Sequence, residues 1–124
     1  MKRYVEANHQ LVVELYTRNL EESLAFYTSF GFDVARKENN FAVLTWDDSQ
    51  LFIEEVKDAP RVDVPVGNIR VMVADVDRYW ELARQLGARV IRPIEDRYYG
   101  LRDFTIAGPD GLGLRFATRL EDLR

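Results

Sequence analysis

The chain contains the same segment pattern twice, and this repeat limits the possible folds more than any other feature. In each copy an extended apolar run leads into a helix-capping residue, an apolar helical stripe and a terminal glycine. The caps Asn19 and Asp75 are 56 positions apart (75 − 19), and the glycines Gly31 and Gly87 repeat that spacing (87 − 31). Since this pattern is kept while residue identity is not, we expect two copies of one supersecondary unit.

The first copy reads as a strand, a helix and three further strands. A strand is predicted over 11–16, where β-branched residues are frequent and polarity alternates. Asn19, with Glu22 three residues later, predicts a helix start, and Gly31 predicts its end. Turn-rich sequence separates three further predicted strands, which are Asp33–Lys37, Phe41–Trp46 and Leu51–Val56.

The second copy repeats this order after a predicted linker, Lys57–Val66, which carries two prolines. A helix is predicted over Val76–Leu86, and the predicted strands are Asn68–Val73, a segment near Val90–Ile91, a segment near Phe104–Ile106, and Leu112–Ala117. Leu51 and Leu112 are 61 positions apart (112 − 51), so the second copy gains five residues (61 − 56). We expect these in a loop from Pro93 to Gly100, and an insertion in one copy indicates a specialised copy.

Composition excludes several classes of function. A length of 124 residues with 47% apolar and 31% charged residues indicates one globular domain, and the absence of a long apolar run indicates no membrane partner and a cytoplasmic location. Acidic residues outnumber basic ones 21 to 17, which argues against nucleic acid as a partner. The chain has no cysteine, and His9, its single histidine, is expected to be an incidental surface residue.

Side chains alternate along a strand, so each predicted strand has two faces. One face is aliphatic and is expected to pack on the helices; it holds Leu11, Val13, Leu15, Leu51, Ile53, Ile69, Val71, Val73, Leu112, Leu114 and Phe116. The other face is mixed; it holds Val12, Glu14, Tyr16, Phe52, Glu54, Val56, Asn68, Arg70, Met72, Gly113, Arg115 and Ala117. Such a face is either the solvated side of an antiparallel sheet or the lining of a half-polar pocket, and its apolar members favour the pocket.

Two motifs carry a resemblance to a known family. The helix Asn19–Tyr27 and the ending Gly100–Gly111, followed by Leu-Gly-Leu-Arg-Phe, resemble the vicinal oxygen chelate superfamily, and most of all its glyoxalase/bleomycin-resistance group. One departure is visible, because the usual Asp-Pro-Asp-Gly turn reads Gly108-Pro109-Asp110-Gly111. The resemblance implies an α+β fold in which two βαβββ repeats, about 11–56 and 68–118, form an incompletely closed eight-stranded mixed barrel, commonly in a homodimer.

The resemblance also implies where a metal would bind. The metal enzymes of the superfamily take one ligand from the first and the last strand of each repeat, and these positions fall on Val12, Glu54, Asn68 and Arg115. Only Glu54 suits a transition metal, so no metal cofactor is expected. Glu14 and Glu54 could together hold Mg²⁺ or Ca²⁺ weakly, but arginines on the same predicted face favour ion pairing with these acids instead.

We therefore predict a metal-independent protein that binds a small aromatic or planar organic molecule, including antibiotic resistance by sequestration. The alternative is a metal-dependent lyase, isomerase or extradiol-type dioxygenase of the same superfamily with an altered metal site, and a metal-free enzyme with a Glu base is a third reading. No catalytic residue and no cofactor are assigned. The predicted ligand-binding residues are Glu14, Tyr16, Trp46, Glu54, Asn68, Arg70, Tyr98, Tyr99, Arg102 and Arg115.

Overall fold

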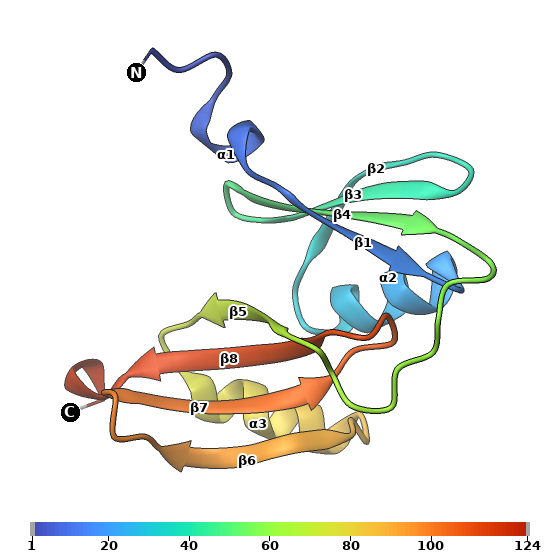
Figure 1. The fold of residues 1–124 in the computed structure, drawn as a ribbon. Coiled ribbons are helices and arrows are strands. Elements are labelled where there is room, and N and C mark those ends of the chain that lie inside the picture. Colours follow the sequence, from blue (N-terminus) through green and yellow to red (C-terminus); the bar gives the residue numbers. More distant parts are fainter. Residues whose placement is uncertain (1, 124) are drawn as a thin grey trace. The chain divides into compact units, whose positions relative to one another are not determined.

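The computed structural model describes residues 2–123, which form two compact units that meet in sequence between Pro60 and Arg61. This boundary falls inside the predicted linker. Each unit contains one four-stranded sheet with a ten-residue helix (Figure 1). Among the described residues, no helix combines the length and the apolar character needed to cross a bilayer.

The first unit begins with a short helix, α1 (Ala7–Gln10), that the sequence pattern did not predict. Its sheet has the order β1-β4-β3-β2, with β1 parallel to β4 and the other neighbours antiparallel. The remaining elements are β1 (Val13–Thr17), α2 (Leu20–Ser29), β2 (Asp33–Lys37), β3 (Phe41–Trp46) and β4 (Ser49–Glu55).

The second unit repeats this topology, with the order β5-β8-β7-β6 and β5 parallel to β8. The predicted strand, helix and three-strand order is therefore confirmed in both copies. Its elements are β5 (Asn68–Met72), α3 (Val76–Gln85), β6 (Val90–Asp96), β7 (Leu101–Ala107), β8 (Gly113–Arg119) and a closing 3₁₀ turn, η1 (Leu120–Asp122).

The helix boundaries follow the predicted caps. The Asn19 side chain accepts a hydrogen bond from the Glu22 backbone N–H at 3.0 Å, and the Asp75 side chain accepts one from Arg78 at 3.3 Å. Each cap satisfies an N–H that has no partner within the helix. Gly31 and Gly87, with φ of 116° and 69°, then take the left-handed conformation that ends both helices.

The aliphatic face of each sheet packs on its helix, as predicted, except at the start of β1. Leu15, Leu51 and Ile53 are buried in the first unit, and Leu114 and Phe116 in the second. Leu11 and Val13, however, are 89% and 52% exposed, so their predicted burial is wrong. The reason is geometric, because α2 lies against the C-terminal end of β1 and leaves the beginning of that strand uncovered (Figure 1).

The extra residues of the second copy lengthen a strand instead of forming a long loop. β6 runs from Val90 to Asp96, and only Arg97–Gly100 turns into β7. Pro93 is tolerated because β6 is the edge strand and its register shifts between Arg92 and Glu95. The prediction of a loop from Pro93 to Gly100 is therefore wrong for its first half.

Strand register also corrects the expected match between the two copies. In the parallel pairs, Glu14 lies opposite Phe52, whereas Arg70 lies opposite Arg115. Glu14 and Arg70 are equivalent positions of the two copies, since they keep the 56-residue spacing (70 − 14). Their strand partners must then be equivalent too, so Phe52 corresponds to Arg115 at a spacing of 63 (115 − 52). The spacing of 61 that relates Leu51 to Leu112, and therefore Glu54 to Arg115, is wrong by two residues.

Candidate functional site

Each sheet has one face turned away from its helix, which we call the open face. Register places Glu14, Tyr16, Phe52 and Glu54 on the open face of the first unit, as parity predicted. It places Asn68, Arg70 and Arg115 on the open face of the second unit. Six of the ten predicted ligand-binding residues thus lie on these two faces, and the two faces differ in chemistry.

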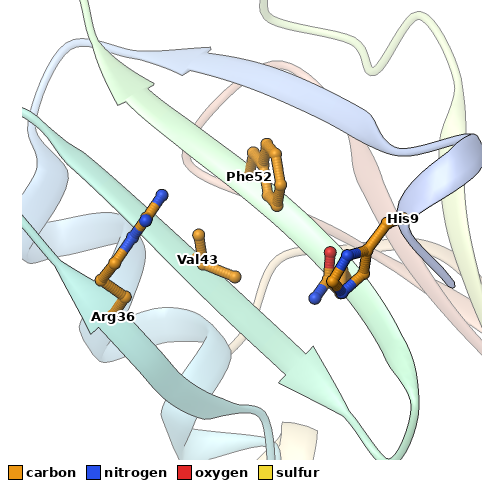
Figure 2. A pocket seen from close by; sticks show the side chains of 5 residues that line it. His9, Arg36, Val43 and Phe52 are labelled. Carbon is orange, nitrogen blue, oxygen red and sulfur yellow. The ribbon is translucent and has the colours of Figure 1, made fainter. Parts of the chain in front are cut away.

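The open face of the first unit contains a hollow of about 380 Å³ (Figure 2). A volume of this order is that of a small-molecule site. Val43 and Phe52 form its floor, and Figure 2 shows Arg36 and His9 on opposite sides of this apolar pair. Gln50 completes the lining. His9 reaches the hollow from α1; it is an exposed surface residue, as expected, and it also borders the hollow.

Aromatic and acidic residues continue this face toward β1 and the end of β4. The rings of Phe41 and Phe52 meet edge to face with their centroids 5.5 Å apart, an arrangement that favours a fixed aromatic surface. Tyr16, opposite Glu54 in the β1–β4 ladder, is 62% exposed. Neither Glu14 nor Glu54 forms an ion pair with a described residue of its own unit.

The open face of the second unit centres on Arg115. Its Nε donates to the Thr105 hydroxyl at 2.9 Å, and its Nη2 donates at 3.1 Å to Asn68 when that amide is oriented to satisfy both of its neighbours. Gly113 makes room for this arrangement, since a Cβ there would clash with Asn68 and lie 2.8 Å from Thr105. The guanidinium is thus held in place by three strands.

Arg70 lies directly opposite Arg115 on the neighbouring strand. Within the described part of their unit, neither arginine forms an ion pair with a carboxylate. Like charges directly opposite each other across two strands repel. An anionic or strongly polar group on a ligand would relieve this repulsion, because guanidinium binds carboxylate and phosphate in a fixed geometry.

A buried acid, Asp103, lies two residues from Thr105 on the same face of β7. It is 0% exposed; Tyr99 donates its hydroxyl to it at 2.6 Å, and Arg97 Nε donates at 2.9 Å. Burial alone would raise the pKa of Asp103, but the hydrogen bonds from Tyr99 and Arg97 and the positive charges of Arg115 and Arg97 outweigh it and lower that pKa. Burial and the bond to Asp103 raise the pKa of Tyr99. Asp103 therefore stays ionised and fixes the turn that carries Tyr98 and Tyr99.

The remaining predicted ligand residues have different surroundings. Trp46 shares the helix-facing side of β3 with Leu44 and packs edge to face on Phe32, with the ring centroids 5.1 Å apart. Arg102 also lies on the helix-facing side, where it binds Asp77 and Asp96, each at 3.0 Å. Tyr98 is 100% exposed at the turn. The structure thus brings Asn68, Arg70 and Arg115 together on one face, and places Trp46 and Arg102 on the helix-facing sides of their own sheets.

The residues at the expected metal positions do not fit a metal. The corrected register places Phe52, not Glu54, at the position that matches Arg115. At this spacing of 63, Glu54 corresponds to Ala117 (117 − 54), so the four positions hold either Val12, Phe52, Asn68 and Arg115 or Val12, Glu54, Asn68 and Ala117. Either set includes at most one carboxylate and no imidazole. In the part of the chain that the structure describes, no group of three or more His, Asp or Glu side chains could hold a metal ion.

Sequence reasoning missed four residues that shape the open faces. Arg36 and His9 border the hollow, whereas Thr105 and Asp103 position the charges of the second unit. A signal existed for Thr105 and Asp103, since both alternate with the buried Phe104 and must share the face of Arg115. No local signal marks His9 or Arg36, because α1 and the irregular register of β2 bring them to the hollow.

Comparisons with known proteins agree with this architecture. A chain described as a glyoxalase/bleomycin resistance protein/dioxygenase from Nocardioides superimposes with a TM-score of 0.76 at 21% identity, covering 94% of this chain and 87% of that one. A bleomycin-binding protein complexed with bleomycin gives a TM-score of 0.70 at 18% identity, with coverage of 89% and 98%. A lactoylglutathione lyase from Agrobacterium tumefaciens gives 0.71 at 18% identity, with coverage of 91% and 96%. At these identities the likeness shows a shared fold.

A search of curated protein sequences finds no significant match. The family model, in contrast, matches residues 9–116, which include both repeats and the linker between them. The chain therefore belongs to the Glyoxalase/Bleomycin resistance protein/Dioxygenase superfamily.

Proposed function

We propose that this protein binds a small aromatic or planar organic molecule without a metal. The observation that carries the proposal is the Arg115 guanidinium, which is held by Thr105 and Asn68 and forms no ion pair with a carboxylate among the described residues of its unit. A preorganised cation beside an exposed second one, Arg70, favours a ligand with an anionic or strongly polar group. The first unit by itself also has an aromatic surface, formed by Phe41 and Phe52, that suits a planar molecule.

The family relationship supports this reading without fixing the ligand. One structural neighbour is a bleomycin-binding protein, and another is a lactoylglutathione lyase. The residues at the expected metal positions, with at most one carboxylate and no imidazole, favour binding over metal-dependent chemistry in this chain. The proposal extends to antibiotic resistance by sequestration in the cytoplasm and to a homodimer. Light scattering of the purified protein tests the homodimer directly.

Calorimetric titration with a panel of aromatic and planar compounds, including antibiotics, tests the proposal in buffer with a chelator. We expect at least one compound to bind, and Arg115→Gln to weaken that binding about tenfold, as expected for loss of a charge-assisted hydrogen bond. Arg78→Gln is the matched control, because it removes the same charge from an exposed position on α3.

Two results would overturn the proposal. One is the absence of binding by every compound of the panel. The other is stoichiometric Fe, Mn, Ni or Zn in protein purified without chelator, together with ligand binding that is lost when this metal is removed.

A further inference from the structure

We propose that the hollow of the first unit is a binding site for a small aromatic carboxylate. The inference rests on the proposed ligand-binding function and assigns part of it to one cavity, whose lining is His9, Arg36, Val43, Gln50 and Phe52. The lining combines an apolar floor with nitrogen donors at its borders (Figure 2). That combination specifies both the body and the charge of a ligand.

The floor favours a planar ring. Phe52 is fixed by its edge-to-face contact with Phe41, and Val43 lies opposite Phe52 in the β3–β4 ladder. Together they present an aromatic ring and a β-branched side chain side by side. An aromatic ligand gains from stacking or edge contact with Phe52 in addition to the apolar area it buries.

The borders favour a negative charge. Arg36 supplies a guanidinium, His9 an imidazole and Gln50 an amide, and none of the five lining residues is acidic. Arg36 forms an ion pair with Glu38 at 3.5 Å, and both side chains are well exposed (61% and 60%). An exposed pair of this kind contributes little, so a ligand carboxylate can replace Glu38 and bind the guanidinium through two oxygens.

The arrangement of the two borders sets the orientation of the ligand. Arg36 and His9 stand on opposite sides of Val43 and Phe52 (Figure 2). A ring lying on the floor with its carboxylate at Arg36 therefore points its far edge at His9. The His9 imidazole favours a hydrogen-bonding substituent on that edge, and the Gln50 amide in the same lining offers a second hydrogen-bonding group.

The single histidine makes a direct test possible. In tag-free protein only His9 gives imidazole signals, so ¹H–¹³C NMR reports on this hollow alone. The probe is 2-naphthoate. The first control, 2-naphthylmethylamine, has the same ring system and the opposite charge, and the second, acetate, is a carboxylate without a ring. We expect 2-naphthoate to shift the His9 signals in a saturable way, and the amine and acetate to bind at least tenfold more weakly.

Two substitutions locate the contacts. Arg36→Gln should weaken 2-naphthoate binding about tenfold, whereas Lys37→Gln should leave it unchanged. Lys37 is the matched control because it is the next residue of β2, loses the same charge and lies on the helix-facing side, where it pairs with Glu21 at 3.1 Å. Phe52→Leu, which keeps an apolar floor, should weaken binding about threefold through the loss of the ring.

The outcomes separate this inference from the proposed function. Binding of the amine as tight as that of 2-naphthoate overturns the aromatic carboxylate site. Binding of 2-naphthoate, or of any panel compound, with no His9 shift and no effect of Arg36→Gln overturns the site but leaves the proposed function standing. Absence of binding by the probes and the whole panel overturns both.

Discussion

The two units are copies of one design that agree on their helix-facing side and differ on their open faces. Both cap the helix with an Asn or Asp side chain, end it at a left-handed glycine and bury aliphatic strand residues beneath it. On the open faces, register matches Glu14 with Arg70, Phe52 with Arg115, and Phe41 with Asp103. The first unit thus has an aromatic, acidic face with a hollow, and the second has a basic face with a buried acid.

This difference shows which part of a duplicated unit is free to change. The helix-facing side must exclude water, so each copy keeps apolar residues of similar size there. The open face does not pack on the helix, so its residues differ in charge between the two copies. A charged residue that becomes buried on this face needs partners: the carboxylate of Asp103 is bound by Arg97 and Tyr99.

The substitution with the largest expected effect on stability removes the Asp103 carboxylate. Asp103→Ala leaves the Arg97 guanidinium without its buried partner and should lower the free energy of unfolding by about 3 kcal/mol or more. Urea unfolding followed by circular dichroism measures it. The matched control, Asp96→Ala, breaks the exposed pair with Arg102 and should cost about 1 kcal/mol or less. Equal losses in the two variants would mean that Asp103 is not a special feature of the second unit.

The next effect concerns Gly113, which corresponds to Gln50 of the first unit. Gly113→Ala puts a Cβ where Asn68 and Thr105 already lie and should cost about 1 to 3 kcal/mol through overpacking. It should also release Arg115, so binding that depends on Arg115 weakens. Gln50→Ala, at the equivalent position, should change stability by less than about 0.5 kcal/mol. Thermal unfolding of both variants makes the comparison, and a harmless Gly113→Ala would contradict the close packing.

The helix caps should show where the copies agree. Asn19→Ala and Asp75→Ala each remove one side-chain acceptor at a helix start and should each cost about 1 kcal/mol. Chemical denaturation of the two single variants is the measurement, with Asn19→Ser and Asp75→Asn as capping controls that retain most of the stability. A loss of stability in only one of the two variants would show that only one cap stabilises its helix.

The smallest expected effect is a difference in acid sensitivity. The folded state lowers the pKa of Asp103, so it binds fewer protons than the unfolded chain and the resulting stability is present above the usual Asp pKa. That contribution is lost as pH falls through the lowered pKa. The free energy of unfolding of the wild type should therefore fall more steeply between about pH 5 and about pH 3, around the ordinary pKa of Asp, than that of Asp103→Asn. Urea unfolding of both proteins at each pH measures this. Parallel curves would contradict an ionised Asp103.

The sequence by itself determined the units and their order. The caps, the apolar alternation and the terminal glycines are local signals carried by neighbouring residues, and they correctly predicted both helices and all eight strands. They also predicted the open-face positions of Glu14, Arg70 and Arg115. Local signals sufficed there because cap geometry and strand alternation depend on adjacent residues alone.

Tertiary structure decided what no run of neighbouring residues encodes. Register between strands far apart in sequence matched Arg115 with Phe52 and placed Trp46 on the helix-facing side. Pairing of β6 with β7 turned an expected loop into a strand and brought Arg97 and Tyr99 onto Asp103. The short helix α1 carried His9 to the hollow. These features depend on hydrogen bonds and packing between separate segments, and a one-residue change of register would turn every side chain of a strand to the other face.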